Sequence, residues 1–184
     1  MARRHDDSII REQRDAVVAR MPRSAARGRV RLGPRGWSCV LGKRAIVALK
    51  REGDGATPAG RFGFRRVLYR PDRMALPPTG LPVGAIKPDD GWCDAPNDRI
   101  YNRPVTLPYG ASAEKMWRED GLYDVVVVLG HNDCPRVRWR GSAVFMHVWS
   151  PDRGPTAGCV ALARHDLLEL VAHLAPGAAL VIRP

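Results

Sequence analysis

The chain has 184 residues, of which 45% are hydrophobic and 27% charged. This composition excludes a disordered protein and predicts one globular domain with a hydrophobic core. The 18 glycines and 16 prolines favour strands and turns over a helical bundle. Uninterrupted apolar runs fall well short of the roughly 18 residues that a membrane helix needs, so no transmembrane segment is expected.

The net charge of +11 is concentrated near the N-terminal end. Residues 1–51 contain 14 Lys or Arg and 4 Asp or Glu, whereas residues 52–184 contain 16 and 15. Such a basic end suits an anionic partner, namely a nucleic acid, a lipid head-group layer or an acidic polymer. A general bias towards arginine explains the charge equally well. Because no RNA-binding aromatic pattern or zinc ribbon is present, no specific nucleic-acid partner is predicted.

Residues 1–28 are interpreted as a basic N-terminal arm or helix, and residues 29–184 as one domain with a proline-rich insert at 71–108. Ser8–Met21 has apolar residues at loosely helical spacing, with Pro22 directly after it, which predicts a short amphipathic helix. The first 25 residues show no secretory signal. The protein is therefore either cytoplasmic or exported by a route that the chain does not reveal.

The first half of the domain is predicted to consist of short strands and one proline-rich segment. Residues 71–108 contain eight prolines, and proline neither donates to a strand ladder nor continues a helix, which argues against helix or central strand. We expect this segment to be an ordered cap beside the functional site; a linker is the alternative. The expected strands are 29–32, 37–41, 45–49 and 61–68, with a glycine-rich loop at 53–60.

The second half predicts the centre of a sheet. Residues 123–129 form an unbroken run rich in β-branched side chains, which is typical of a strand buried on both faces. Together with the first half, this pattern indicates a strand-rich α+β domain with mixed β-sheets and short flanking helices. The other expected elements are a helical turn at 113–118, a strand at 142–149, a helix at 164–174 and a strand at 179–182.

Cys159 and His147 form the most reactive combination in the chain. Cys159 follows Gly158 at a predicted turn ahead of a helix, where backbone N–H groups can bind an oxyanion. His147 on a neighbouring strand can take the thiol proton and lower the cysteine pKa from about 8.5. The alternative is that Cys159 is a small buried residue and His147 a core histidine.

The segment P-T-A-G-C-V (Pro155–Val160), after the strand F-M-H-V (Phe145–Val148), resembles the active-site signature of the L,D-transpeptidases with a YkuD domain. The stretch E-G-D-G-A-T-P-A-G-R-F (Glu52–Phe62) resembles the family's early loop and strand. The stretch W-C-D-A-P-N-D-R-I-Y-N-R (Trp92–Arg103) is similar to one in short proteobacterial members. The resemblance covers about Arg29 to Ile182 and implies a single YkuD-like domain.

The resemblance implies the catalytic roles. Cys159 is then the nucleophile, His147 the general base, and the main-chain carbonyl of Val148 fixes the imidazole tautomer. Backbone N–H groups of Gly158 and Cys159 would form the oxyanion hole. Ala157 and Ala161 depart from the family, since most members have His and then Asn or Arg there. The expected substrate-binding residues are Thr156, His131, Asn132, Trp149, Trp92 and Tyr101. A polar strand end is the alternative for His131 and Asn132, and a core position is the alternative for Trp149.

The implied activity is cross-linking of peptidoglycan peptide stems, by 3–3 or 1–3 links, through a thioester acyl-enzyme in the periplasm. No metal or other cofactor is expected, and carbapenems should acylate the cysteine. Two alternatives remain: an L,D-carboxypeptidase that trims muropeptides, and a non-enzymatic basic module that binds the envelope or nucleic acid. Zinc is disfavoured because His131 and Cys134 lack a second close-spaced pair. Cys39, Cys93 and Cys134 are interpreted as unpaired packing residues.

Overall fold

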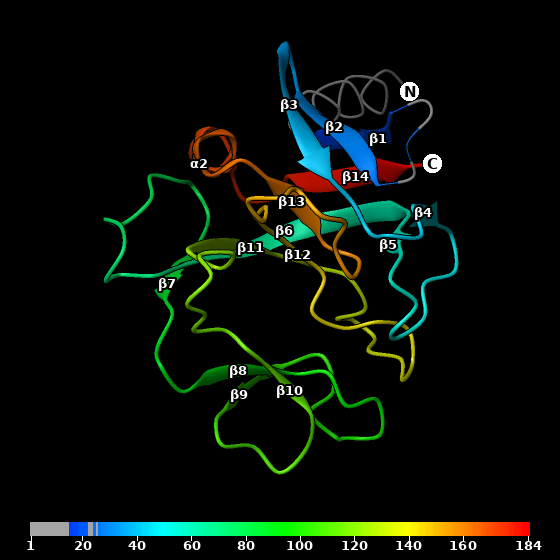
Figure 1. Ribbon diagram of the computed structural model, residues 1–184, viewed down its shortest axis with the longest axis vertical. Helices are drawn as coiled ribbons and strands as arrows, with labels where there is room; N and C mark the ends of the chain where they lie inside the picture. The colour runs from blue at the N-terminus through cyan, green and yellow to red at the C-terminus, as the bar shows by residue number, and fades with distance from the viewer. Residues whose placement is uncertain (1–14, 22–23, 25) are drawn as a thin grey trace, which may run out of the picture.

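The computed structural model describes residues 15–21, 24 and 26–184. Strands dominate this part of the chain, which contains a single helix, α2 (Arg164–Ala172), close to the predicted range of 164–174. Figure 1 shows the strands of a large sheet and α2 in the upper half and a smaller sheet below. Among the described residues, no helix is long and apolar enough to cross a membrane.

The large sheet contains nine of the described strands and is mixed. Their order is β11-β12-β13-β3-β2-β1-β14-β6-β7, and β11 also pairs with β6, so the pairing closes into a ring that leaves out only β7. Parallel pairs join β1 to β14, β12 to β13 and β6 to β7. The bounds are β1 (Ala16–Arg20), β2 (Arg27–Leu32), β3 (Arg35–Val40), β6 (Gly60–Tyr69), β7 (Val83–Ala85), β11 (Val125–Leu129), β12 (Phe145–Val148), β13 (Val160–Leu162) and β14 (Ala179–Arg183).

β11 is buried on both faces, as its β-branched run predicts. Val125 and Val127 belong to the main core, together with Leu167 and Leu170 of α2. Val126, on the opposite face, belongs to a second cluster with Phe145, Trp92 and Cys159. Because side chains alternate across a strand, β11 and β12 each contribute to both clusters, and the second cluster holds the reactive cysteine.

The helix expected over Ser8–Met21 is wrong for its described part. Ala16–Arg20 forms β1, which pairs with β2 and, from the far end of the chain, with β14. Ala16 and Val18 are fully buried, so period-two burial replaces the helical pattern. These residues thus join the sheet of the domain that was expected to begin at Arg29, while residues 8–14 lie outside the described part.

The proline-rich segment is ordered and contains short strands. Besides β7, it forms β8 (Asp90–Cys93) and β9 (Pro104–Thr106), and β8 is the central strand of a three-stranded sheet. The expectation that the segment holds no central strand is therefore wrong, because residues 89–95 form a proline-free interval. The third strand is β10 (Ala113–Lys115), where a helical turn was predicted. Ile86 and Trp92 pack in the cluster that contains Cys159.

Two short elements support the glycine-rich loop. β4 (Ile46–Val47) and β5 (Thr57–Pro58) pair in parallel, so the strand expected at 45–49 is shorter than predicted. The loop between them turns at Gly53 and Gly55, both of which have positive φ.

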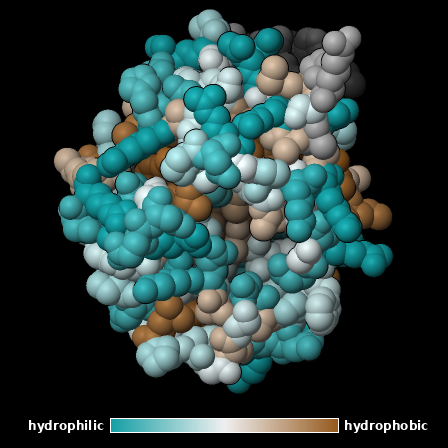
Figure 2. All heavy atoms as spheres, in the orientation of Figure 1, coloured by the Kyte–Doolittle hydropathy of each residue, from teal (hydrophilic) through white to brown (hydrophobic). Residues whose placement is uncertain are grey.

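Figure 2 shows that the face of the protein seen in Figure 1 is mostly hydrophilic, with small separate apolar areas.

Candidate active site

Both residues of the expected catalytic pair line a cavity of about 430 Å³. Cys159 and His147 line it from the large sheet, and Glu114 and Asp94 line it from the small sheet and its loops. Lys50 lines it from the loop before β5. The cavity therefore lies where the large sheet, the small sheet and the glycine-rich loop meet.

Strand register places Cys159 and His147 on one face. β12 and β13 are parallel, with Met146 opposite Val160 and His147 opposite Ala161, so Cys159 lies beside Phe145. The two reactive residues are thus on the same face and two positions apart along the strands. Cys159 immediately precedes a strand; the helix expected after it begins only at Arg164.

The Cys159 thiol is buried and protonated in this state. Its Sγ donates to the Ala143 carbonyl at 3.3 Å and accepts from the Phe145 N–H at 3.4 Å. Burial raises the pKa of the thiol to about 12, although the Phe145 N–H and the charge of Lys50 act in the opposite direction. The expected lowering of the cysteine pKa is therefore wrong for the resting protein, because desolvation outweighs the favourable contacts.

His147 is buried in its neutral form. Its Nδ1 lies 2.7 Å from the Val148 carbonyl, and since a carbonyl can only accept, Nδ1 carries the proton. Nε2 is then the unprotonated ring nitrogen. Burial lowers the pKa of His147 to about 4, and the Tyr123 ring packs against the imidazole with centroids 5.4 Å apart.

The turn before Cys159 is held by Thr156. The Thr156 hydroxyl donates to the Cys159 carbonyl at 2.7 Å and accepts from the Gly158 N–H at 3.1 Å. Gly158 has φ +143, and a Cβ there would lie 2.7 Å from the Ala56 carbonyl oxygen. Because the Gly158 N–H already donates to the Thr156 hydroxyl, it is not free to bind an oxyanion, which contradicts its expected place in the oxyanion hole. Thr156 lines the cavity and shapes the turn.

Five of the expected substrate-binding residues do not line the cavity: His131, Asn132, Trp149, Trp92 and Tyr101. Trp92 and Tyr101 are buried, Trp92 packs edge-on against Phe145, and none of the five lines the cavity. His131 Nε2 lies 2.9 Å from the Arg140 carbonyl, and Arg153 covers the Trp149 ring. The expected substrate contacts are therefore not seen at these five positions.

Asn102 was not predicted, and it joins Trp92 and the His131–Asn132 loop to Ala143, the residue whose carbonyl contacts the thiol. Its Oδ1 accepts from Trp92 Nε1 at 3.0 Å and from the Ala143 N–H at 3.1 Å. Its Nδ2 donates to the carbonyls of His131 at 3.0 Å and Asn132 at 2.9 Å. The Ala143 carbonyl in turn accepts the hydrogen bond of the Cys159 thiol. The W-C-D-A-P-N-D-R-I-Y-N-R stretch contains Asn102, but only the fold reveals these partners.

Charged residues around the cavity were also missed. Lys50 is 6% exposed and pairs with Asp54, while Glu52 accepts from the Ser142 hydroxyl at 2.7 Å and from the Tyr101 hydroxyl. On the opposite wall, Glu114 accepts from the Tyr123 hydroxyl at 2.7 Å. The glycine-rich stretch after Lys50 is the sequence signal that could have drawn attention to this group.

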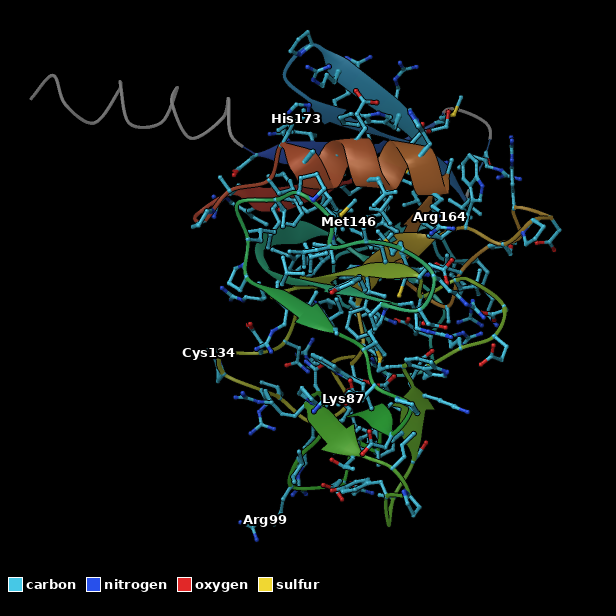
Figure 3. All side chains as sticks on the ribbon, turned by 90° about the vertical axis from the view of Figure 1, so that its left-hand side faces the viewer. Lys87, Arg99, Cys134, Met146, Arg164 and His173 are labelled. Atoms are coloured by element: carbon cyan, nitrogen blue, oxygen red, sulfur yellow. The ribbon has the colours of Figure 1, made fainter. Side chains whose placement is uncertain are left out.

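The remaining cysteines are free thiols in the structure. Cys39 and Cys93 are buried, in agreement with a packing role, and burial raises the pKa of both thiols. Cys134 is exposed, so its interpretation as a packing residue is wrong; Figure 3 shows it at the outer edge, far from Met146 in the core. Over residues 15–21, 24 and 26–184, no three His, Cys, Asp or Glu side chains cluster as metal ligands would.

The comparison with protein families decides the affiliation of the chain. The family model of the YkuD L,D-transpeptidase catalytic domain matches residues 11–182, nearly the whole chain. The chain belongs to the YkuD family. The resemblance noted around Cys159 is thereby confirmed at the level of the family. Members of this family are typically cysteine-dependent L,D-transpeptidases that act on peptidoglycan stems.

No curated protein matches this YkuD domain significantly, and neither does any solved structure. The family therefore indicates the reaction class, and the geometry of the site is what bears on the roles of single residues.

Proposed function

We propose that this YkuD domain is a peptidoglycan L,D-transpeptidase in which Cys159 is the nucleophile and His147 the general base. One observation supports this most directly: both residues line one cavity, and the Val148 carbonyl holds the proton on Nδ1. The imidazole is therefore oriented and has Nε2 ready to accept a proton. A merely structural cysteine would need neither the cavity nor this histidine.

The protonation states indicate the order of events. With the thiol pKa near 12 and the His147 pKa near 4, the resting pair is neutral at pH 7. The thiol proton therefore passes to Nε2 as Sγ attacks the stem carbonyl. The tetrahedral adduct then collapses to a thioester, and the departing amine takes the proton from His147. No free thiolate needs to accumulate.

The second half of the reaction repeats these steps in reverse. The amine of another stem attacks the thioester, gives a proton to Nε2, and expels the thiol, which recovers that proton. The product is a cross-link of the 3–3 or 1–3 type; water in place of the amine would give the carboxypeptidase product. The acceptor stem belongs to polymerised peptidoglycan, which lies outside the cytoplasmic membrane, so we place the reaction in the periplasm. The basic N-terminal third of the chain would meet anionic envelope polymers there.

The test uses disaccharide-tetrapeptide muropeptides and mass analysis of the products. Wild-type protein should form dimers, and Cys159→Ala and His147→Gln should not. Cys134→Ala removes an exposed cysteine and serves as the matched control with unchanged activity. Dimers formed by Cys159→Ala would refute the proposed mechanism, and release of the terminal residue without dimers would identify a carboxypeptidase.

A further inference from the structure

Lys50 is a buried cation next to the residue that precedes the nucleophile. It is 6% exposed and lines the same cavity as Cys159 and His147. Its Nζ lies 3.4 Å from the position that a Cβ on Gly158 would occupy. A Cβ on Gly141 would lie 2.9 Å from Cγ of Lys50. The absence of side chains at these two glycines thus leaves room for the lysine in the cavity wall.

The ammonium group is fixed in direction and has a donor to spare. Nζ donates to the Arg51 carbonyl at 3.1 Å and to Asp54 Oδ1. Asp54 is itself held by the backbone N–H groups of Arg51 at 2.7 Å and Ala56 at 2.9 Å. A lysine has three N–H donors, so one remains after these two contacts. A rigid, partly desolvated donor of this kind is what stabilises developing charge in an active site.

The oxyanion site needs such a donor. Backbone N–H groups of Gly158 and Cys159 were expected to form it, but the Gly158 N–H already donates to Thr156. The Cys159 N–H is the remaining main-chain donor of the expected pair, and the Lys50 ammonium lies beside this turn, 3.4 Å from the position of a Cβ on Gly158.

We propose that the Lys50 ammonium, held by Asp54, donates its remaining hydrogen bond to the oxyanion that forms when Cys159 attacks an acyl carbonyl. This inference rests on the proposed function. It makes Lys50 a catalytic residue and Asp54 a positioning residue. The alternative is that the Lys50–Asp54 pair only fastens the glycine-rich loop, and the two roles predict different kinetics.

The experiment compares two reactions of the same sulfur atom. Acylation of Cys159 by a carbapenem passes through a tetrahedral oxyanion, whereas alkylation by iodoacetamide does not. Lys50→Met should slow acylation about 10²-fold, the usual cost of one oxyanion donor, and slow alkylation far less. With muropeptides, kcat should fall while KM changes little. Lys50→Arg should recover part of the acylation rate because it keeps the charge.

Two further variants control for structure. Lys87→Met removes the same charge from an exposed position in the lower half of the molecule (Figure 3) and should leave both rates unchanged. Lys50→Met/Asp54→Asn removes both partners, so it avoids leaving the half-buried Asp54 carboxylate without its cation. If this double variant keeps the wild-type melting temperature and still acylates slowly, the loss is chemical.

The results separate the two proposals. If Lys50→Met slows acylation and alkylation equally, or slows neither, the proposed role of Lys50 is overturned. The proposed transpeptidase reaction is not affected by that result. Failure of wild-type Cys159 to be acylated by the carbapenem or by muropeptides would instead refute the proposed function. Slow acylation with near-normal alkylation in Lys50→Met supports the inference.

Discussion

Asn102→Ala should destabilise the protein and disturb the thiol from a distance. Asn102 is 5% exposed and makes four hydrogen bonds between the small sheet and the loops that lead to Cys159. Each buried partner left unsatisfied costs about 1–3 kcal/mol, and some regain water, so we expect a loss of about 3–5 kcal/mol in the free energy of unfolding. The backbone φ at position 102 is +57, and alanine tolerates this conformation less well than asparagine, so the variant is also strained there.

Urea unfolding monitored by tryptophan fluorescence measures this loss. Trp92 donates to Asn102, so its emission should also change in the folded variant. Asn97→Ala, at an exposed position, is the matched control and should stay near wild-type stability. Acyl transfer should fall as well, since the Ala143 backbone, whose carbonyl accepts the thiol's hydrogen bond, loses its contact with Asn102. A change in unfolding free energy below about 1 kcal/mol would refute the assignment of Asn102 as the connection.

Three further outcomes follow from the site. First, kcat/KM should fall as the pH drops through about 4, where His147 gains its proton. The free energy of unfolding should already decrease as the pH falls below 6.5, the ordinary pKa of histidine, because the unfolded chain binds that proton more readily. A pH–rate profile with an inflection near 6.5 would contradict this. Second, iodoacetamide at pH 7 should label exposed Cys134 before Cys159, whose thiol pKa is about 12; peptide mapping that finds Cys159 labelled first would argue for a resting thiolate. Third, Gly158→Ala should lower activity in the muropeptide assay more than tenfold, because the new Cβ would lie 2.7 Å from the Ala56 carbonyl oxygen. Gly33→Ala is the control: Gly33 also has positive φ, but a Cβ there would have no atom within 4 Å, so activity should not change.

Local patterns predicted the parts of the molecule whose neighbours are near in the chain. The β-branched run of β11 and the helix α2 were found in this way, and so was the Gly158-Cys159 turn after β12. Ala16–Arg20 was misread because its burial depends on pairing with β14, more than 160 residues later. A strand buried on alternate residues and a short amphipathic helix look alike over so few positions.

The cavity was predicted only in part for the same reason. The reactive pair belongs to adjacent strands and a recognisable motif, so Cys159 and His147 could be named from the sequence. Lys50 reaches the site because Gly141 and Gly158 leave space for it, and no local signal encodes that convergence. Trp92 and Tyr101 were expected to contact substrate because aromatic residues in a proline-rich segment suggest a binding wall, yet both are buried supports.

The central claim is that the reaction passes through a thioester on Cys159. Intact-protein mass spectrometry after rapid acid quenching, followed by peptide mapping, tests it during turnover of a tetrapeptide muropeptide. We expect an adduct on the peptide that contains Cys159, with the mass of the donor muropeptide less the amine that it releases: the terminal amino acid for a 3–3 link, or the rest of the stem for a 1–3 link. No adduct is expected in Cys159→Ala. Turnover without any adduct on Cys159, or an adduct on Cys39, Cys93 or Cys134 instead, would contradict it.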